Sequence, residues 1–160
     1  MLFVDRLHLK IKEHGSPAMV GIDPRLDKLP EPFLSKANQG VPQAAEALTE
    51  YNRNLIDILH QHVGIIKPQS AFFEHLGHLG IKALEDLCSY AKEKDLLVLM
   101  DAKRGDIGST SKAYASTFLE GGHLGRMVPS DALTINPYLG EDACEPFIEI
   151  AKKEGAGLYV

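Results

Sequence analysis

Apolar residues follow two alternating patterns along this chain. Short runs of apolar or small residues are typical of buried strands, whereas apolar residues three or four positions apart are typical of helices. The runs predict strands at residues 18–22, 63–66, 96–100, 132–135 and 157–160. The helical spacing predicts an opening helix that ends before Gly15 and helices at residues 43–62, 71–94 (with interruptions at its glycines), 112–120 and 143–153. Residues 26–42, which contain three prolines, are predicted to be mostly loop.

Strands that alternate with helices predict a parallel α/β sheet, and two architectures fit. Five strands in 160 residues suit an open doubly wound sheet, whereas a (β/α)8 TIM barrel needs about 250 residues, so this chain would cover only its first half. The strand ends carry polar groups, namely Asp23, Lys67, Asp101 and Asn136. A barrel brings such ends to one pocket, which favours the barrel. We therefore expect residues 1–160 to be the N-terminal part of a single barrel domain, truncated inside an apolar run.

Composition and charge argue against several classes of function. The net charge of -5 gives no basic surface for nucleic acid. No apolar run approaches the ~20 residues of a membrane span, and the charged N-terminal segment lacks the apolar core of a signal peptide. The two cysteines, Cys88 and Cys144, are far apart in sequence, which suits a reducing compartment. We therefore expect a cytoplasmic protein with neither a nucleic-acid nor a membrane partner.

The predicted strand at residues 96–100 is followed at once by a charged segment, DAKRGD. Because strand side chains alternate, Asp101 and Lys103 are expected to point the same way at the carboxyl end of the strand, with Asp106 close behind. Two nearby glycines let the backbone turn tightly, and Ser109 or Thr110 is expected to cap the helix that follows. In parallel α/β sheets this edge is where active sites lie.

The charges at this edge suit one kind of chemistry. If Lys67, Asp101, Lys103 and Asp106 share a pocket, the alternating charges keep the lysines as ammonium groups and the aspartates as carboxylates. The group contains no nucleophile of the Ser/His or Cys/His kind. It is suited to hold an acidic proton beside a developing carbanion, with a carboxylate against an anionic group that the substrate loses. That pattern predicts decarboxylation, with a lysine as the general acid.

Residues 101–107, DAKRGDI, resemble the DxKxxDI signature of the orotidine 5'-phosphate decarboxylase family. Three other segments are similar to the longer bacterial subgroup of that family: GIDPR at 21–25, IIKP at 65–68 with FFE at 72–74, and TINPYLG at 134–140. The resemblance extends from about Phe3 to the last residue. It implies a cofactor-free (β/α)8 barrel that works as a homodimer without a metal. It also implies conversion of orotidine 5'-monophosphate (OMP) to UMP and CO2, the last step of de novo pyrimidine synthesis.

The resemblance also implies roles for individual residues. Lys103 matches the proton donor to C6 of the pyrimidine, and Asp101 matches the carboxylate held against the departing carboxylate. Lys67 matches the lysine that contacts the ribose and orders the charges, and Asp23 matches the ribose-binding aspartate. A pocket-lining role is expected for Asn136.

Three further residues match positions that reach into the site of the partner subunit, so that each pocket would be composite: Asp106, Ile107 and Thr110. The family's phosphate-gripping arginine and glutamine and the serine that holds its pyrimidine would fall beyond Val160. Because remote phosphate binding drives transition-state stabilisation, we expect an isolated fragment of residues 1–160 to be nearly inactive.

Two other functions fit parts of the sequence. Magnesium-dependent sugar-phosphate decarboxylases and aldolases of the same superfamily share the DxKxxD pattern. They place an acidic metal ligand where this chain has Lys67, and a cation there would repel Mg2+. A receiver or nucleotide-binding module would suit the length, but receivers need paired acids near the end of the first strand, and Asp23 has none beside it.

Overall fold

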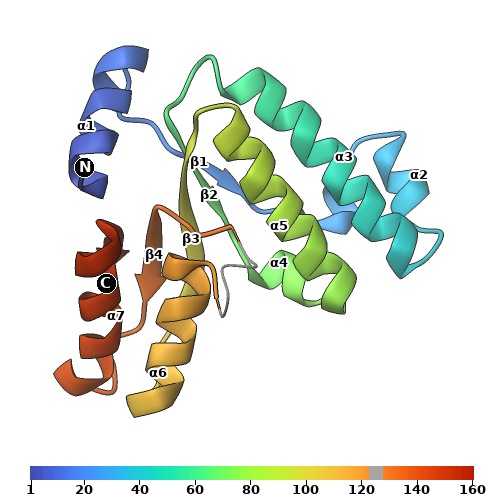
Figure 1. Ribbon diagram of the computed structural model, residues 1–160. Coiled ribbons are helices and arrows are strands. Elements are labelled where there is room, and N and C mark those ends of the chain that lie inside the picture. The colour runs from blue at the N-terminus through green and yellow to red at the C-terminus, as the bar shows by residue number, and fades with distance from the viewer. Residues whose placement is uncertain (123–127) are drawn as a thin grey trace.

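Five parallel strands form one sheet, in the order in which they occur along the chain (Figure 1). The structure is a computed structural model, described here for residues 1–122 and 128–160. The strands are β1 (Val20–Ile22), β2 (Ile65–Pro68), β3 (Leu97–Arg104), β4 (Ala132–Ile135) and β5 (Gly157–Tyr159). Each strand pairs with the one before it, so the predicted parallel α/β sheet is confirmed.

The strand order distinguishes between the two predicted architectures. In an open doubly wound sheet the order reverses at a switch point, and helices cover both faces. Here every crossover leads to the next strand in the same direction, so right-handed connections place the crossover helices on one face. The open doubly wound alternative is therefore wrong, and the order is that of a (β/α) barrel.

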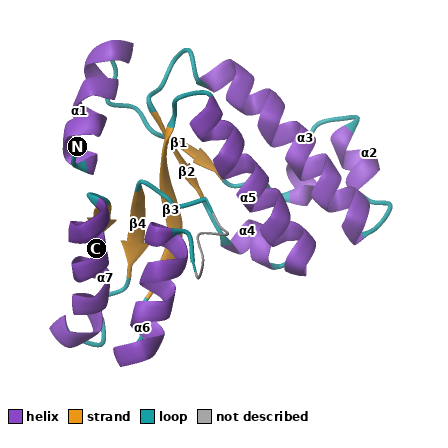
Figure 2. Ribbon diagram, viewed as in Figure 1, coloured by secondary structure: helices purple, strands orange, loops and turns teal. Residues whose placement is uncertain are grey.

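Helices flank the strands (Figure 2). Figure 1 shows α3 and α5 side by side over one part of the sheet, and α6 and α7 side by side over another. The long helices are α1 (Phe3–His14), α3 (Val41–Leu59), α5 (Gly77–Glu93), α6 (Gly108–Ala115) and α7 (Glu141–Glu154). The short elements are η1 (Leu26–Lys28), α2 (Phe33–Ala37), α4 (Ala71–Glu74) and the π-helical turn η2 (Ser116–Glu120). None of the described helices is long and apolar enough to span a membrane.

The two faces of the sheet bury different sets of residues, as the period of two in a strand requires. The side chains of one set lie under the crossover helices in the larger core: Ile66, Val98, Met100 and Leu133. The alternate set packs on the opposite face with Phe3 of α1: Ile65, Leu97, Leu99 and Ala132. The ion pair between Lys10 of α1 and Asp95, just before β3, has an N–O distance of 2.5 Å. Helix α1 therefore covers the amino end of this second face and leaves its carboxyl end open.

Several local predictions need correction. Residues 26–42 are not mostly loop, because Pro32 and Pro42 stand at the starts of α2 and α3, where proline is favoured. Strand β3 runs on to Arg104, since its carboxyl end pairs with β4. The segment 112–120 divides into the end of α6 and the π-helical turn η2. Neither Ser109 nor Thr110 caps α6, because the helix starts earlier, directly after Ile107.

Gly80 is a position where the fold admits no side chain. It lies on the buried face of α5, and a Cβ atom there would be 1.9 Å from the carbonyl oxygen of Phe73. Gly80→Ala gains ~1 kcal/mol of helix propensity, but it forces α4 and α5 apart. We predict a net loss of about 2 kcal/mol in the free energy of unfolding, measured by urea titration. His78→Ala, an exposed change on the same helix, serves as the control, and equal stability of the two variants would contradict the packing described here.

Candidate active site

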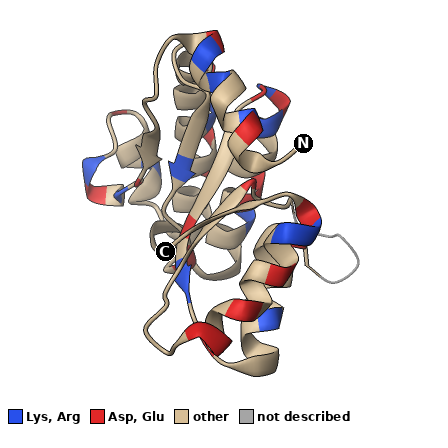
Figure 3. Ribbon diagram, turned by 90° about the vertical axis from the view of Figure 1, so that its left-hand side faces the viewer, with Lys and Arg blue, Asp and Glu red and all other residues tan. Residues whose placement is uncertain are grey.

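A buried carboxylate at the carboxyl end of β3 receives two ammonium groups. The Nζ atom of Lys67, on β2, lies 2.8 Å from Asp101 Oδ2, and the Nζ atom of Lys103 lies 2.6 Å from Asp101 Oδ1. Asp101 is only 3% exposed. Three of the four charged residues that the sequence was expected to bring together therefore do meet. In Figure 3 the strands carry little charge along most of their length, and charged residues appear near their ends.

Two polar side chains that the sequence reasoning did not select complete the partners of this carboxylate. Thr134, on β4, donates its hydroxyl to Asp101 Oδ1 at 2.9 Å, and Gln69 donates its side-chain amide to Oδ2 at 3.0 Å. Their sequence positions give only a weak signal, and the contacts themselves depend on strand pairing. Thr134 is the polar residue in the apolar run ALTI, and Gln69 directly follows β2 and forms an isolated parallel bridge with Asp101.

These contacts lower the pKa of the Asp101 carboxyl group. Burial acts to raise the pKa, because it disfavours the charged form. Hydrogen bonds from Lys103, Lys67 and Thr134 favour the carboxylate and outweigh burial, so that the pKa falls from 3.8 to about 2. Asp101 is therefore an anion throughout the neutral range.

Lys103 occupies an unusual backbone conformation. Its φ angle is +48°, in the left-handed region that residues other than glycine seldom adopt, and the β3–β4 register shifts between Met100 and Arg104. Its backbone N–H donates to the hydroxyl oxygen of Thr134 at 2.9 Å. Such a conformation costs of order 1–3 kcal/mol and persists only where its surroundings impose it. The irregularity lets the side chain reach Asp101 while remaining 65% exposed at the open end of the sheet.

The turn after β3 places the remaining predicted residues of this segment at the surface. The carboxylate of Asp106 accepts a hydrogen bond from the backbone N–H of Ile107 at 2.7 Å. Ile107 is 61% exposed, and Thr110 is exposed in the first turn of α6. Among the described residues, no hydrogen bond or ion pair joins Asp106 to Lys67, Asp101 or Lys103. Within one chain, Asp106 therefore stands outside the buried charge cluster.

The two other predicted residues follow β1 and β4. Asp23 lines a cavity of about 200 Å³ at the end of β1, together with the buried Asn52 of α3. Asn136 is exposed, and its side-chain oxygen accepts a hydrogen bond from the backbone N–H of Tyr138 at 3.0 Å. Both residues thus lie at the carboxyl edge, and Asn136 shapes a turn there.

The arrangement supplies a fixed anion beside an accessible ammonium group. Such a site can donate a proton to a basic carbon and can repel a second carboxylate placed against Asp101. It offers a poor cation site, because Lys67 and Lys103 neutralise the carboxylate that a metal would need. In residues 1–122 and 128–160, no three His, Cys, Asp or Glu side chains gather in a way that could hold a metal ion.

The lowered pKa of Asp101 makes a prediction about stability in acid. Its contribution to the free energy of unfolding is complete above the ordinary pKa near 3.8 and is lost as the pH falls through about 2. Between pH 4 and pH 2 the wild type should therefore lose about 2 kcal/mol more than Asp101→Asn, measured by urea titration at each pH. Asp5→Asn, on the exposed side of α1, is the control. Equal losses in wild type and Asp101→Asn would show that the carboxylate is not held as described.

Relatives with a shared name cover the whole of this chain. An orotidine 5'-phosphate decarboxylase of Rhodopirellula baltica is 41% identical over an alignment of 162 positions that covers 100% of this chain and 54% of the relative. One of Streptomyces coelicolor is 41% identical over 158 residues, 99% of this chain and 53% of the relative. The chain thus spans about half the length of the curated relatives it matches.

Solved structures agree with the fold. A Streptomyces avermitilis protein designated an orotidine 5'-phosphate decarboxylase matches with a TM-score of 0.81 and 40% identity, over 99% of this chain and 52% of that one. The OMP decarboxylase of Leishmania donovani matches with a TM-score of 0.73 and 30% identity, over 100% of this chain and 53% of that one. A family model described as "Orotidine 5'-phosphate decarboxylase / HUMPS family" matches residues 21–160. The resemblance seen in the sequence is therefore confirmed, and the chain belongs to the orotidine 5'-phosphate decarboxylase / HUMPS family.

Proposed function

We propose that this chain forms part of an enzyme that decarboxylates OMP to UMP and CO2 in pyrimidine biosynthesis. The observation that carries the proposal is the cluster of Lys67, Asp101 and Lys103, at 2.8 and 2.6 Å, on the open carboxyl edge of a barrel-type sheet. The relatives named for this reaction, which match nearly the whole chain, support the proposal.

Each charge has a defined task in this reaction. The bond between C6 of the pyrimidine and its carboxylate breaks, CO2 leaves, and the electron pair stays on C6. The Nζ atom of Lys103 gives C6 a proton and is later reprotonated from water. Asp101, whose low pKa keeps it ionised, lies against the departing carboxylate, and the repulsion is relieved as neutral CO2 forms. Lys67 balances the charge of Asp101 and contacts the ribose.

No cofactor is needed for these steps. The position of Lys67 supports a metal-free reaction, because its ammonium group lies 2.8 Å from the carboxylate that would otherwise attract a cation. A magnesium-dependent sugar-phosphate decarboxylase or aldolase of the same superfamily is the second candidate. The shared family supports it, and Lys67 argues against it.

The exposed residues of the edge fit roles in binding and assembly. We assign Asp23 and Asn136 to the substrate pocket, with Asp23 on the ribose. Asp106, Ile107 and Thr110 lie at the surface, where they can reach the site of a second copy in a homodimer. In this arrangement Asp106 would complete the charge array of the partner subunit. We propose a cytoplasmic location, because the free thiols of Cys88 and Cys144 suit a reducing compartment.

The proposed proton donor gives the first test of activity. Lys103→Ala is expected to lower kcat for UMP formation from OMP by roughly a hundred- to ten-thousandfold, because it removes the general acid. UMP is measured by chromatography, in a chain of the length of the curated relatives. Lys12→Ala, on exposed α1 and remote from the site, should retain wild-type turnover. Unchanged turnover by Lys103→Ala would exclude the proposed role.

A second test concerns how much of the enzyme residues 1–160 represent. We propose that they form the N-terminal part of a single barrel domain and lack the groups that grip the substrate phosphate. A protein of residues 1–160 alone should turn OMP over at least ~100-fold more slowly than a chain of the relatives' length, because remote binding energy is lost. Circular dichroism shows whether the short protein is folded. Equal turnover by the two proteins would place the phosphate grip within these 160 residues.

A further inference from the structure

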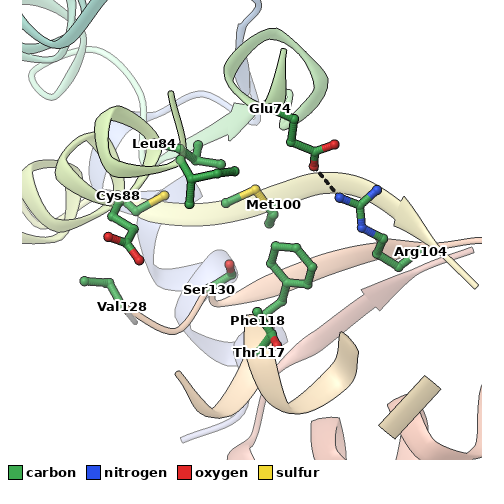
Figure 4. Close-up of a pocket in the computed structure, with 11 residues that line it drawn as sticks. Glu74, Leu84, Cys88, Met100, Arg104, Thr117, Phe118, Val128 and Ser130 are labelled. Carbon is green, nitrogen blue, oxygen red and sulfur yellow. Dashed lines mark hydrogen bonds and ion pairs between the residues drawn. The ribbon is translucent and has the colours of Figure 1, made fainter. Parts of the chain in front are cut away.

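Arg104 follows Lys103 on β3 and contacts the helices on the other face of the sheet. Its guanidinium group forms an ion pair with Glu74 at the end of α4 (Figure 4) and donates a hydrogen bond to the carbonyl oxygen of Ala102 at 3.3 Å. The guanidinium carbon also lies 5.5 and 5.8 Å from the ring centroids of Tyr114 and Phe118. Arg104 is thus held from several sides by α4, its own strand and the α6–η2 segment.

The two partners of this ion pair belong to segments that also hold the charge cluster. Glu74 ends the short segment that starts at Gln69 and Ser70, and the backbone N–H of Ser70 donates to the carbonyl oxygen of Asp101 at 3.1 Å. On the other side, the carbonyl oxygen of Arg104 accepts the backbone N–H of Asn136 at 2.8 Å. The ion pair therefore ties the segment after β2 to the end of β3, directly behind the site.

Lys103 needs such support more than its neighbours do. Its backbone has a φ angle of +48° at a shift of register, so its N–H bonds the hydroxyl oxygen of Thr134 in place of a regular strand partner. Its side chain is 65% exposed, and Asp101 is the ammonium group's one ionic partner among the described residues. A small rotation of the adjoining peptide would therefore move the ammonium group with little resistance from packing.

We propose that the Glu74–Arg104 ion pair is a positioning pair for Lys103. By anchoring the peptide that follows Lys103, it keeps the strained backbone in place and directs the ammonium group to Asp101 and to the reacting carbon. The inference rests on the proposed function, since it assigns Lys103 the proton transfer. Arg104 and Glu74 themselves do not touch the substrate, because their side chains contact the helices behind the sheet.

The test compares kinetic constants in a chain of the relatives' length. Arg104→Met and Glu74→Gln each remove one charge and keep similar volume. Each should lower kcat for OMP roughly 10- to 100-fold, because displacement of a catalytic group by about 1 Å has effects of that size. KM should stay within about twofold, since binding groups are untouched. The double variant should be no slower than the slower single variant, and Arg104→Lys should recover part of the lost kcat.

The matched control is the surface ion pair of Lys82 and Asp86 on α5, which is removed by Lys82→Met or Asp86→Asn without loss of kcat. Absence of OMP turnover in the wild type would refute the proposed function. An active wild type, with folded Arg104→Met and Glu74→Gln variants of normal kcat, would overturn the positioning role alone. The positioning role would also be overturned if the variants had normal kcat at temperatures well below those at which they unfold. That result would show that the ion pair only stabilises the fold.

Discussion

The carboxylate of Asp101 joins the ends of three strands. Removing a carboxylate from water is costly unless charged and hydrogen-bonding groups replace the solvent. Asp101 obtains them from Lys67 on β2, from Lys103 on its own strand and from Thr134 on β4. The contacts that make its burial possible also bring two ammonium groups to fixed positions. Stability of the sheet edge and arrangement of the candidate site therefore depend on the same group.

Two features determine the position of this carboxylate: the alternation of side chains along β3 and the packing of α1 against one half of the sheet. Along one face of β3, Leu97 and Leu99 are buried with Phe3, and Asp101 and Lys103 come next on the same face. Helix α1 packs on the amino half of this face and leaves the carboxyl half for polar groups. Because all strands are parallel and in sequential order, their carboxyl ends meet at one edge. The fold thus separates a packed apolar half from a charged half.

The sequence predicted the parts of the site that follow from the repeat of apolar residues along single strands and helices. The five strands, and the shared side of Asp101 and Lys103, follow from short apolar runs and from alternation along a strand. The contribution of Thr134 depends on the register of β4 against β3, which no local pattern determines. The same register shift accompanies the left-handed backbone of Lys103. Both architectures contain the same alternating elements, so the polar strand ends could only favour the barrel, and the sequential strand order confirms it.

Some errors came from signals with two meanings. Proline breaks a helix interior but favours a helix start, so Pro32 and Pro42 were interpreted as loop residues although they begin helices. Ser109 and Thr110 are good capping residues, yet α6 begins before them, and Ile107 at its N-cap position offers no side-chain hydrogen bond. These errors lie outside the ends of β2 and β3, so the expected meeting of Lys67, Asp101 and Lys103 is found, whereas Asp106 stands outside that cluster.

Decarboxylation by an ion network, without a metal, is tested most directly by the formation of UMP from OMP in excess EDTA. The protein assayed is a chain of the length of the curated relatives that contains residues 1–160. We predict the same rate of UMP formation with EDTA and with added Mg2+, because Lys67 and Lys103 already neutralise Asp101. A protein that forms no UMP, or one that loses activity in EDTA and regains it with Mg2+, would contradict this account.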